Sequence, residues 1–279
     1  MHTNLIFDQP LASLPAGFVD SCRYAAAQLD ATTAGNFTNN VQVGFGELNG
    51  MPIDGALALA MPNQLTSMSY QDLLWQLTIH ASNSLDRQMV SNLPETEPAD
   101  LTNVNLLVTS CQKKAWNLQN PNDSTIDGYV GISSQYPLAM DLAHRAAPGA
   151  YDLVSIFEHE ETQEMGRLPY DGVMRLLSFQ APGQFAPDGS TSIYLSADNG
   201  QTNLGSLSPI GDRADLLNQS QQMDPFYYVT PSGVQQDLTL LDKNIMSALG
   251  FAQTGDVVHF HCGHHHHRMQ FVDRYHDGR

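Results

Sequence analysis

The residues best suited to chemistry lie in one short stretch, 157–167, with the sequence FEHEETQEMGR. His159 and Gln163 are four positions apart, so in a helix they lie on the same face. In the H-E-x-x-H signature of zinc proteases, two histidines at this spacing bind Zn²⁺, and the glutamate after the first acts as general base on a metal-activated water. His159 and Glu160 match the first half of that signature, whereas Gln163 stands where the second histidine is expected.

Taken alone, this stretch has two interpretations. The neutral amide oxygen of Gln163 binds zinc less well than an imidazole or a carboxylate. Glu164 and Glu161 do not replace it, because they lie about 140° and about 200° round the helix from His159. The alternative to a metal site is therefore a solvated His-Glu pair on a helix surface.

The helix that carries these residues should begin after Pro148-Gly149 and end at Gly166, a residue type common at helix C-termini. Ser69, with Asp72 three residues later, gives a near capping box at the start of another helix. Apolar residues at helical or alternating spacing place the other elements. The pattern predicts helices at 15–33, 69–82, 149–167 and 235–251, strands at 4–8, 40–48, 104–110 and 127–134, and short pieces joined by turns at 171–185 and 191–207.

The composition limits which class of protein this chain can belong to and which partners it can bind. The 279 residues, 42% of them apolar, are enough for one large domain or two small ones with a hydrophobic core. Acidic residues outnumber basic ones 29 to 12, and the net charge of −17 argues against nucleic acid or an anionic membrane surface as a partner. No apolar run is long enough to span a membrane, and the first residues lack the basic and apolar regions of a signal peptide.

The end of the chain differs in composition from the rest. We expect residues 1–253 to form the domain and residues 254–279 to be a His-rich tail outside the fold. Such a tract binds divalent metals without specificity. A tag, read-through or frame error explains it, and a native metal-delivery tail is the alternative. Its histidines are His259, His261, His264, His265, His266, His267 and His276.

Several stretches resemble, in the same order, a family of secreted bacterial zincin-like metalloproteases. The site helix of that family is of the type EHEI(T/S)EVMGR, and a downstream segment is of the type LDLFRYSAPG. The resemblance covers roughly residues 4–251. The stretches that carry it are 7–30, 41–50, 127–133, 147–160, 174–183, 194–207, 211–216 and 237–251.

The resemblance implies an α+β, zincin-like fold with a mixed sheet, an active-site helix beneath a cleft, and an irregular C-terminal part, 167–253, as the cleft's other wall. It implies that His159 binds Zn²⁺, that Glu160 is the catalytic general base, and that Gly166 and Arg167 end the site helix. It further implies a protein or peptide substrate, a secreted or cell-surface location and a monomer.

Three departures from the family concern the site. Gln163 is predicted at the second metal-ligand position, where the family has a glutamate, and Leu216 replaces a tryptophan. Arg175 stands where the family has an aspartate, which would supply an outer-shell contact or a further ligand. Loss of two acids lowers the attraction for a dication. The sequence therefore predicts a zinc metallopeptidase impaired by Gln163, with a non-catalytic extracellular binding domain on the same fold as the alternative.

Acidic residues further along the chain give a second candidate metal site. Asp212 and Asp215, with Asp198, lie in Gly- and Asn-rich loops and are candidates for a structural Ca²⁺ site. Aspartates in turns also serve backbone geometry alone, so both interpretations stay open.

Two further roles at the site, a third metal ligand and a group that stabilises the oxyanion, each have more than one candidate residue. His144 and His80 are candidates for a third metal ligand, and a surface or core histidine is the alternative for each. Tyr170, Tyr227 and Tyr228 follow the site helix, and zincins often use a downstream tyrosine or histidine to stabilise the oxyanion.

Overall fold

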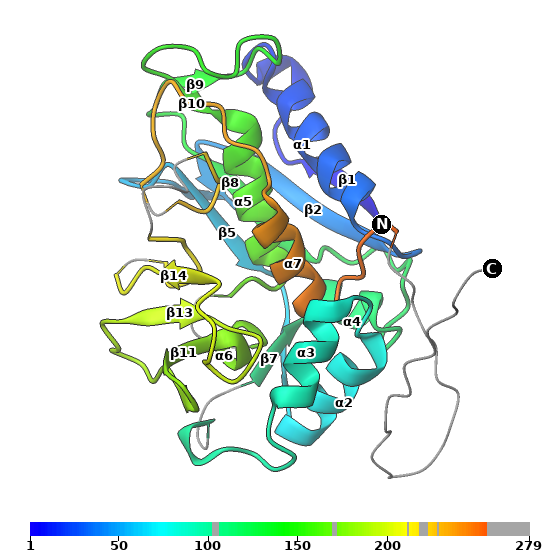
Figure 1. Ribbon diagram of the computed structural model, residues 1–279. Helices are drawn as coiled ribbons and strands as arrows, with labels where there is room; N and C mark the ends of the chain where they lie inside the picture. Colours follow the sequence, from blue (N-terminus) through cyan, green and yellow to red (C-terminus); the bar gives the residue numbers. More distant parts are fainter. Residues whose placement is uncertain (102–105, 169–171, 211, 218–222, 228, 256–279) are drawn as a thin grey trace, which may run out of the picture.

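The computed structural model describes residues 1–101, 106–168, 172–210, 212–217, 223–227 and 229–255. Seven α-helices and several small sheets make up this part of the chain, an arrangement compatible with the expected α+β class (Figure 1). None of its helices has the length and apolar character of a membrane span.

The helix with His159 packs on a four-stranded sheet whose strand order is β1-β2-β8-β5. β1 (His2–Phe7), β2 (Thr38–Phe45) and β8 (Gly128–Ile132) run parallel, and β5 (Ala58–Pro62) pairs antiparallel with β8. β5 therefore forms one edge of the sheet.

Two helices cover one face of this sheet. α1 (Phe18–Thr32) packs beside β1, and α5 (Leu153–Met165) packs against α1, β8 and β5 (Figure 1). Their apolar faces and the strands form one buried cluster, which fixes α5 on the sheet. The fully buried members of that cluster are Phe18, Cys22, Ala25, Val41, Val130, Ile132, Leu153, Val154 and Phe157.

A second hydrophobic cluster joins the N-terminal part of the chain to the C-terminal part. It includes residues of α2 (Tyr70–His80), α3 (Ser84–Asn92) and α7 (Leu240–Ala248), so the two parts share a core. The other elements are β3 (Glu47–Leu48), β4 (Met51–Pro52), β6 (Leu65–Met68), β7 (Leu106–Thr109), α4 (Ser110–Ala115), β9 (Leu138–Ala139), β10 (Tyr151–Asp152), α6 (Met174–Leu177), β11 (Ser178–Ala181), β12 (Gln184–Phe185), β13 (Ile193–Leu195) and β14 (Gly205–Leu207), with short 3₁₀ helices at Leu11–Ser13 and Ala99–Leu101.

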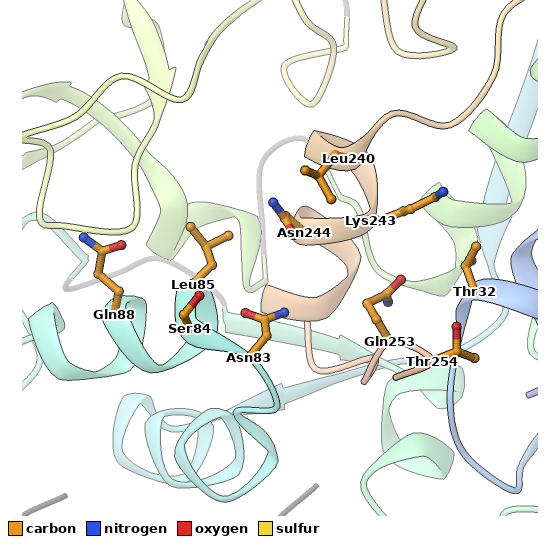
Figure 2. A pocket seen from close by; sticks show the side chains of 10 residues that line it. All are labelled: Thr32, Asn83, Ser84, Leu85, Gln88, Leu240, Lys243, Asn244, Gln253 and Thr254. Atoms are coloured by element: carbon orange, nitrogen blue, oxygen red, sulfur yellow. The ribbon is translucent and has the colours of Figure 1, made fainter. Parts of the chain in front are cut away.

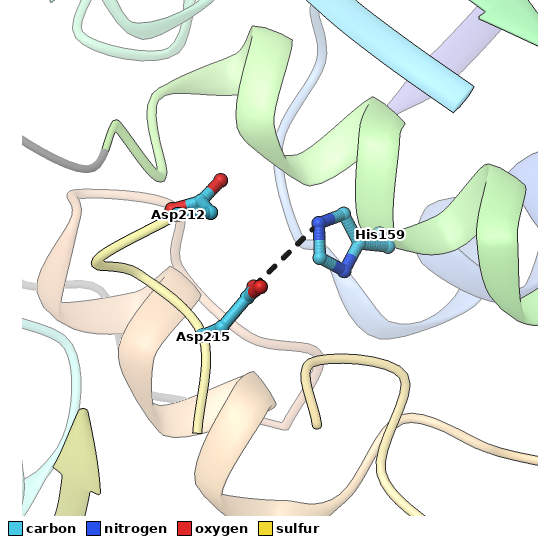
Figure 3. Close-up of side chains that lie close together, drawn as sticks. All are labelled: His159, Asp212 and Asp215. Atoms are coloured by element: carbon cyan, nitrogen blue, oxygen red, sulfur yellow. Dashed lines mark ion pairs between the residues drawn. The ribbon is translucent and has the colours of Figure 1, made fainter. Parts of the chain in front are cut away.

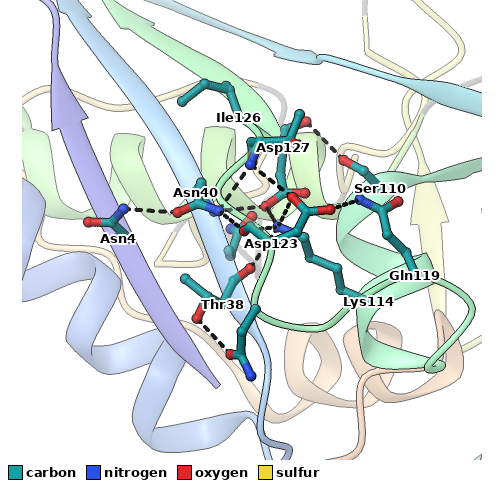
Figure 4. Close-up of polar contacts among 12 residues, drawn as sticks. Asn4, Thr38, Asn40, Ser110, Lys114, Gln119, Asp123, Ile126 and Asp127 are labelled. Carbon is teal, nitrogen blue, oxygen red and sulfur yellow. Dashed lines mark hydrogen bonds and ion pairs between the residues drawn. The ribbon is translucent and has the colours of Figure 1, made fainter.

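A buried lysine fastens α4 to the sheet (Figure 4). The Lys114 ammonium donates to the Asp127 carboxylate over 2.6 Å, and both side chains are fully buried. It also donates to the main-chain oxygens of Thr38 (3.1 Å) and Asp123 (3.3 Å). One ammonium thus joins α4, the start of β2 and the loop that leads into β8.

The site helix has well-defined ends. The Asp152 carboxylate accepts from Val154 N (3.2 Å) at its start and pairs with Arg145. Gly166 ends it with φ of 146°, and a Cβ there would lie 2.7 Å from the side chain of Gln112. The predicted end at Gly166 is confirmed, and the positive φ there favours glycine over residues that carry a Cβ.

The predicted elements differ from the structure in a few places. The predicted 235–251 helix begins only at Leu240, where Thr239 and Asp242 form a capping box. β5 and α3 were not predicted. Thr254, one residue past the expected boundary at 253, bonds to the main-chain oxygens of Ala31 and Thr32. The predicted tail from 256 onwards lies outside the described residues.

Candidate metal centre

The His159 imidazole is held in one orientation. It lies on α5, and its Nδ1–H donates to the main-chain oxygen of Pro225 over 3.0 Å. This bond places the lone pair of Nε2 on the opposite side of the ring. Burial lowers the pKa of His159, which favours the neutral imidazole that a metal ion requires.

Two carboxylates from the C-terminal part approach that nitrogen (Figure 3). His159, Asp212 and Asp215 each offer a ligand atom, and these atoms lie within 4.8 Å of one another. Asp215 Oδ1 is 3.7 Å from His159 Nε2 and has no hydrogen-bond partner in the described part of the chain. Burial, followed by the charge of Asp212, raises the pKa of Asp215 to about 8. A bound cation would offset both the cost of burying the Asp215 carboxylate and its repulsion by Asp212.

Gln163 joins this cluster through its amide nitrogen. Nε2 of Gln163 lies 2.9 Å from Nε2 of His159 and donates to the carboxylate of Asp212. The predicted ligand is therefore at the site, with its N–H groups directed at the other two residues.

Glu160 lies beside the cluster as a separate buried carboxyl group. Its side chain lines the same pocket, and the residue is only 8% exposed. Burial, with the nearby charges of Asp212 and Asp215, raises the pKa of Glu160 well above the usual glutamate range. A carboxyl group of this kind can exchange a proton with a reactant in the pocket.

The pocket has a volume of about 280 Å³ and lies between α5, β5 and the loop that carries Asp212. Its charged or titratable lining residues are acids and one histidine, with no lysine or arginine among those described. The lining residues are Leu57, Ala58, Leu59, Ala60, Ser155, Ile156, His159, Glu160, Gln163, Asp212, Asp215, Pro225, Thr230 and Gln236.

The β5 wall of the pocket presents unpaired main-chain groups. Ser133 N donates to Leu57 O over 2.9 Å, which continues the antiparallel pairing with β8. Peptide groups alternate in direction along a strand, so Leu57 and Leu59 bond towards β8. The N–H and C=O groups of Ala58 and Ala60 face away from β8, and no main-chain group in the described part of the chain pairs with them, so another extended chain could bind there.

Arg167 joins the site helix to the loop that carries the aspartates. Its guanidinium carbon lies 3.2 Å from the centroid of the Phe226 ring. It donates to the Asp242 carboxylate (2.7 Å) and to Ala214 O (3.1 Å) and is fully buried. Arg167 thus follows the end of the site helix at Gly166 and also bonds to the segment between Asp212 and Asp215.

A larger pocket of about 520 Å³ lies elsewhere, between the start of α3, α7 and the end of α1 (Figure 2). Amides, hydroxyls and two leucines line it, and Lys243 is its single charged lining residue among those described. It shares no residue with the candidate metal centre.

Other predicted site residues lie away from this pocket. Arg175 pairs with Asp188 over 3.1 Å and does not line the pocket. His144 is exposed and bonds to Asp141, while His80 stacks on Trp116 near the end of α2. Neither histidine therefore joins His159 as a third ligand.

The predicted grouping of aspartates is corrected by the structure. The Asp198 carboxylate accepts from Thr202 and Ser196 within its own turn. Among the described residues, Asp212 and Asp215 are grouped with His159 and not with Asp198.

Of the predicted tyrosines, Tyr227 is not among the lining residues of the pocket, and Tyr170 and Tyr228 lie outside the described residues.

Sequence reasoning did not connect Asp212 and Asp215 with His159. The available signal was the GDRADL stretch, which places two acids three residues apart in a segment that resembles the metalloprotease family. Nothing in that local pattern indicates which helix the loop approaches. Comparisons with protein-family models, curated proteins and solved structures find no significant match for this chain.

Proposed function

We propose that this chain is a zinc-dependent metallopeptidase with a zincin-like fold. The observation that carries the proposal is the convergence of His159, Asp212 and Asp215 beside the buried Glu160 and the edge strand β5. The order of the family-like stretches, with His159-Glu160 at their centre, points to the same activity.

The donor atoms fit a zinc ion. One imidazole nitrogen and two carboxylate oxygens form a set that Zn²⁺ accepts, whereas Ca²⁺ takes oxygen ligands. Nε2 of His159 lies on the side of the two acids, and within the described residues Asp215 Oδ1 is buried without a hydrogen-bond partner. A bound Zn²⁺ would supply Lewis acidity and would lower the pKa of a water molecule.

Residues of the chain itself would transfer the proton and bind the substrate. With a bound cation offsetting the charges of Asp212 and Asp215, the ionised Glu160 carboxylate would accept a proton from the attacking water and return it to the leaving amine. Ala58 and Ala60 bind the substrate's main chain as an added strand, which brings the scissile bond to the pocket. The acidic lining disfavours acidic peptides, so we expect neutral or basic segments as substrates. We further propose a secreted or cell-surface monomer.

One observation favours a second candidate, a non-catalytic binding domain on the same fold. The Gln163 amide nitrogen lies between His159 and Asp212 and supplies the hydrogen bonds that a metal ion would replace. The β5 edge would then bind a peptide that is not cleaved.

The test uses the full chain with its seven tail histidines replaced by serine, which removes the second metal-binding tract. Substitution is better than truncation because Thr254 bonds to the end of α1. We expect one equivalent of zinc, lost in His159→Ala, and peptide hydrolysis that is lost in Glu160→Gln with zinc retained. Hydrolysis that persists in Glu160→Gln would exclude this mechanism. Zinc binding without hydrolysis of a peptide library would favour the binding domain.

A further inference from the structure

We infer that Gln163 closes the metal-free site and competes with the metal ion for His159 and Asp212. The inference rests on the proposed function, because it concerns how the proposed zinc ligands are satisfied before zinc binds. It assigns Gln163 a role opposite to that of a ligand.

The hydrogen-bond donors and acceptors of His159 and Gln163 support this role. Nδ1–H of His159 is used by Pro225 O, so Nε2 can only accept. The carboxamide of Gln163 has two N–H donors on one nitrogen. That nitrogen is 2.9 Å from His159 Nε2 and also donates to the carboxylate of Asp212. Two ligand atoms of the proposed metal site are thus satisfied by one neutral group.

A glutamate at this position would have no donor to offer. It would add a third carboxylate to Asp212 and Asp215, and without a cation these groups would repel one another. Gln163 instead stabilises the metal-free arrangement. Asp215 Oδ1 stays without a partner in the described part of the chain, so this ligand atom is left open to an incoming cation.

Metal binding must therefore break both hydrogen bonds of the amide. This requirement lowers the affinity for zinc, because each bond contributes to the metal-free state. Removing the amide should then tighten zinc binding, provided that His159, Asp212 and Asp215 remain. If Gln163 were a ligand through its oxygen, the same change would weaken binding, so the two roles differ in sign.

The experiment is calorimetric titration of Zn²⁺ into the full chain with the tail histidines replaced by serine. It is repeated with Gln163→Met, which keeps similar volume without donors, with Gln163→Glu, and with His159→Ala as the site control. We expect Gln163→Met to bind zinc about tenfold more tightly, and its metal-free form to melt at a lower temperature than the parent. If Gln163→Met does not fold, Gln163→Ser, which is too short to reach both acceptors, takes its place.

The outcomes separate this inference from the proposed function. Weaker or equal zinc binding by Gln163→Met, with binding still dependent on His159, overturns the competition and leaves the metal site standing. No zinc binding by the parent, by Gln163→Met and by Gln163→Glu overturns the proposed function and the competition with it. An unchanged melting temperature of metal-free Gln163→Met also counts against the two hydrogen bonds.

Discussion

The ring of Phe226 stacks on the imidazole of His159, with the centroids 4.3 Å apart and the planes inclined by 16°. The guanidinium of Arg167 lies over the same phenyl ring, 3.2 Å from its centroid. One ring face has room for one planar group, so Phe226 is held between the imidazole and the guanidinium. The proposed zinc ligand is therefore positioned by a neighbour that is itself fixed by a buried charge.

Replacing Phe226 by leucine should weaken the metal centre. The imidazole keeps its bond to Pro225 O but loses the surface that fixes its tilt, so we expect zinc affinity to fall about tenfold. Stability should fall by about 1–2 kcal/mol through lost stacking and packing. Zinc titration and urea unfolding measure the two effects.

The matched control is Phe185→Leu. Phe185 is also buried and stacks on Phe179, with the ring centroids 4.7 Å apart, and does not line the candidate pocket. This variant should lose stability and keep its zinc affinity. Equal zinc affinities in the two variants would show that Phe226 does not position His159.

Proline substitutions on β5 separate substrate binding from folding. Ala60 N–H faces away from β8, so Ala60→Pro should remove a donor to the substrate and leave the sheet paired. Leu59 N–H bonds towards Gly131, so Leu59→Pro should remove a ladder hydrogen bond and lower stability clearly more than Ala60→Pro does. We expect kcat/KM to fall at least tenfold in Ala60→Pro at nearly unchanged melting temperature. Full activity in Ala60→Pro would exclude strand addition at this edge.

The pH dependence of stability should include a contribution from Asp224. Burial, together with the charge of Asp242, raises the pKa of Asp224 from 3.8 to about 7. An acid whose pKa is higher in the folded than in the unfolded protein binds more protons in the folded state between those two pKa values. Its contribution to stability is therefore complete below the pKa of the unfolded state and is lost as the pH rises to the pKa of the folded state. Stability should therefore fall between about pH 4 and pH 7 through this residue.

Asp224→Asn removes that titration while keeping an oxygen that can accept from Phe226 N. Urea unfolding should give similar stability for the variant and the parent at pH 4, and a more stable variant at pH 8. Asp54→Asn, at an exposed position, is the control and should follow the parent at both pH values. A constant difference between Asp224→Asn and the parent across this range would contradict the raised pKa.

The part of the site that could be predicted from sequence is local. The α5 helix and its end at Gly166 were predicted from local residues, whereas its predicted start at 149 was four residues early, because Tyr151–Asp152 forms the strand β10 and Asp152 is the N-cap. Asp212 and Asp215 reach His159 from about fifty positions away in sequence, and the contact depends on Arg167 bonding to Ala214 O. No spacing rule contains that tertiary contact.

The burial of two glutamates on α5 and the strand β5 could not be predicted from the sequence, for different physical reasons. Glu161 and Glu164 are fully buried, where Thr3 and Asn39 donate to them, although charged residues on a helix usually face solvent. β5 consists of Ala58–Pro62, whose alanines have low strand propensity, so its pairing with β8 comes from tertiary context.

The buried ammonium of Lys114 gives the last prediction, on stability alone. Lys114→Met should cost about 3–5 kcal/mol, because it leaves Asp127 buried without its charge partner. Adding Asp127→Asn should cost less than the sum of the two single changes, since the uncompensated charge is then gone. Lys113→Met, at a neighbouring lysine that makes an exposed bond to Thr66, should change stability by less than about 0.5 kcal/mol. Urea unfolding of the four variants measures the coupling, and strictly additive losses for Lys114 and Asp127 would mean that the ion pair does not hold α4 to the sheet.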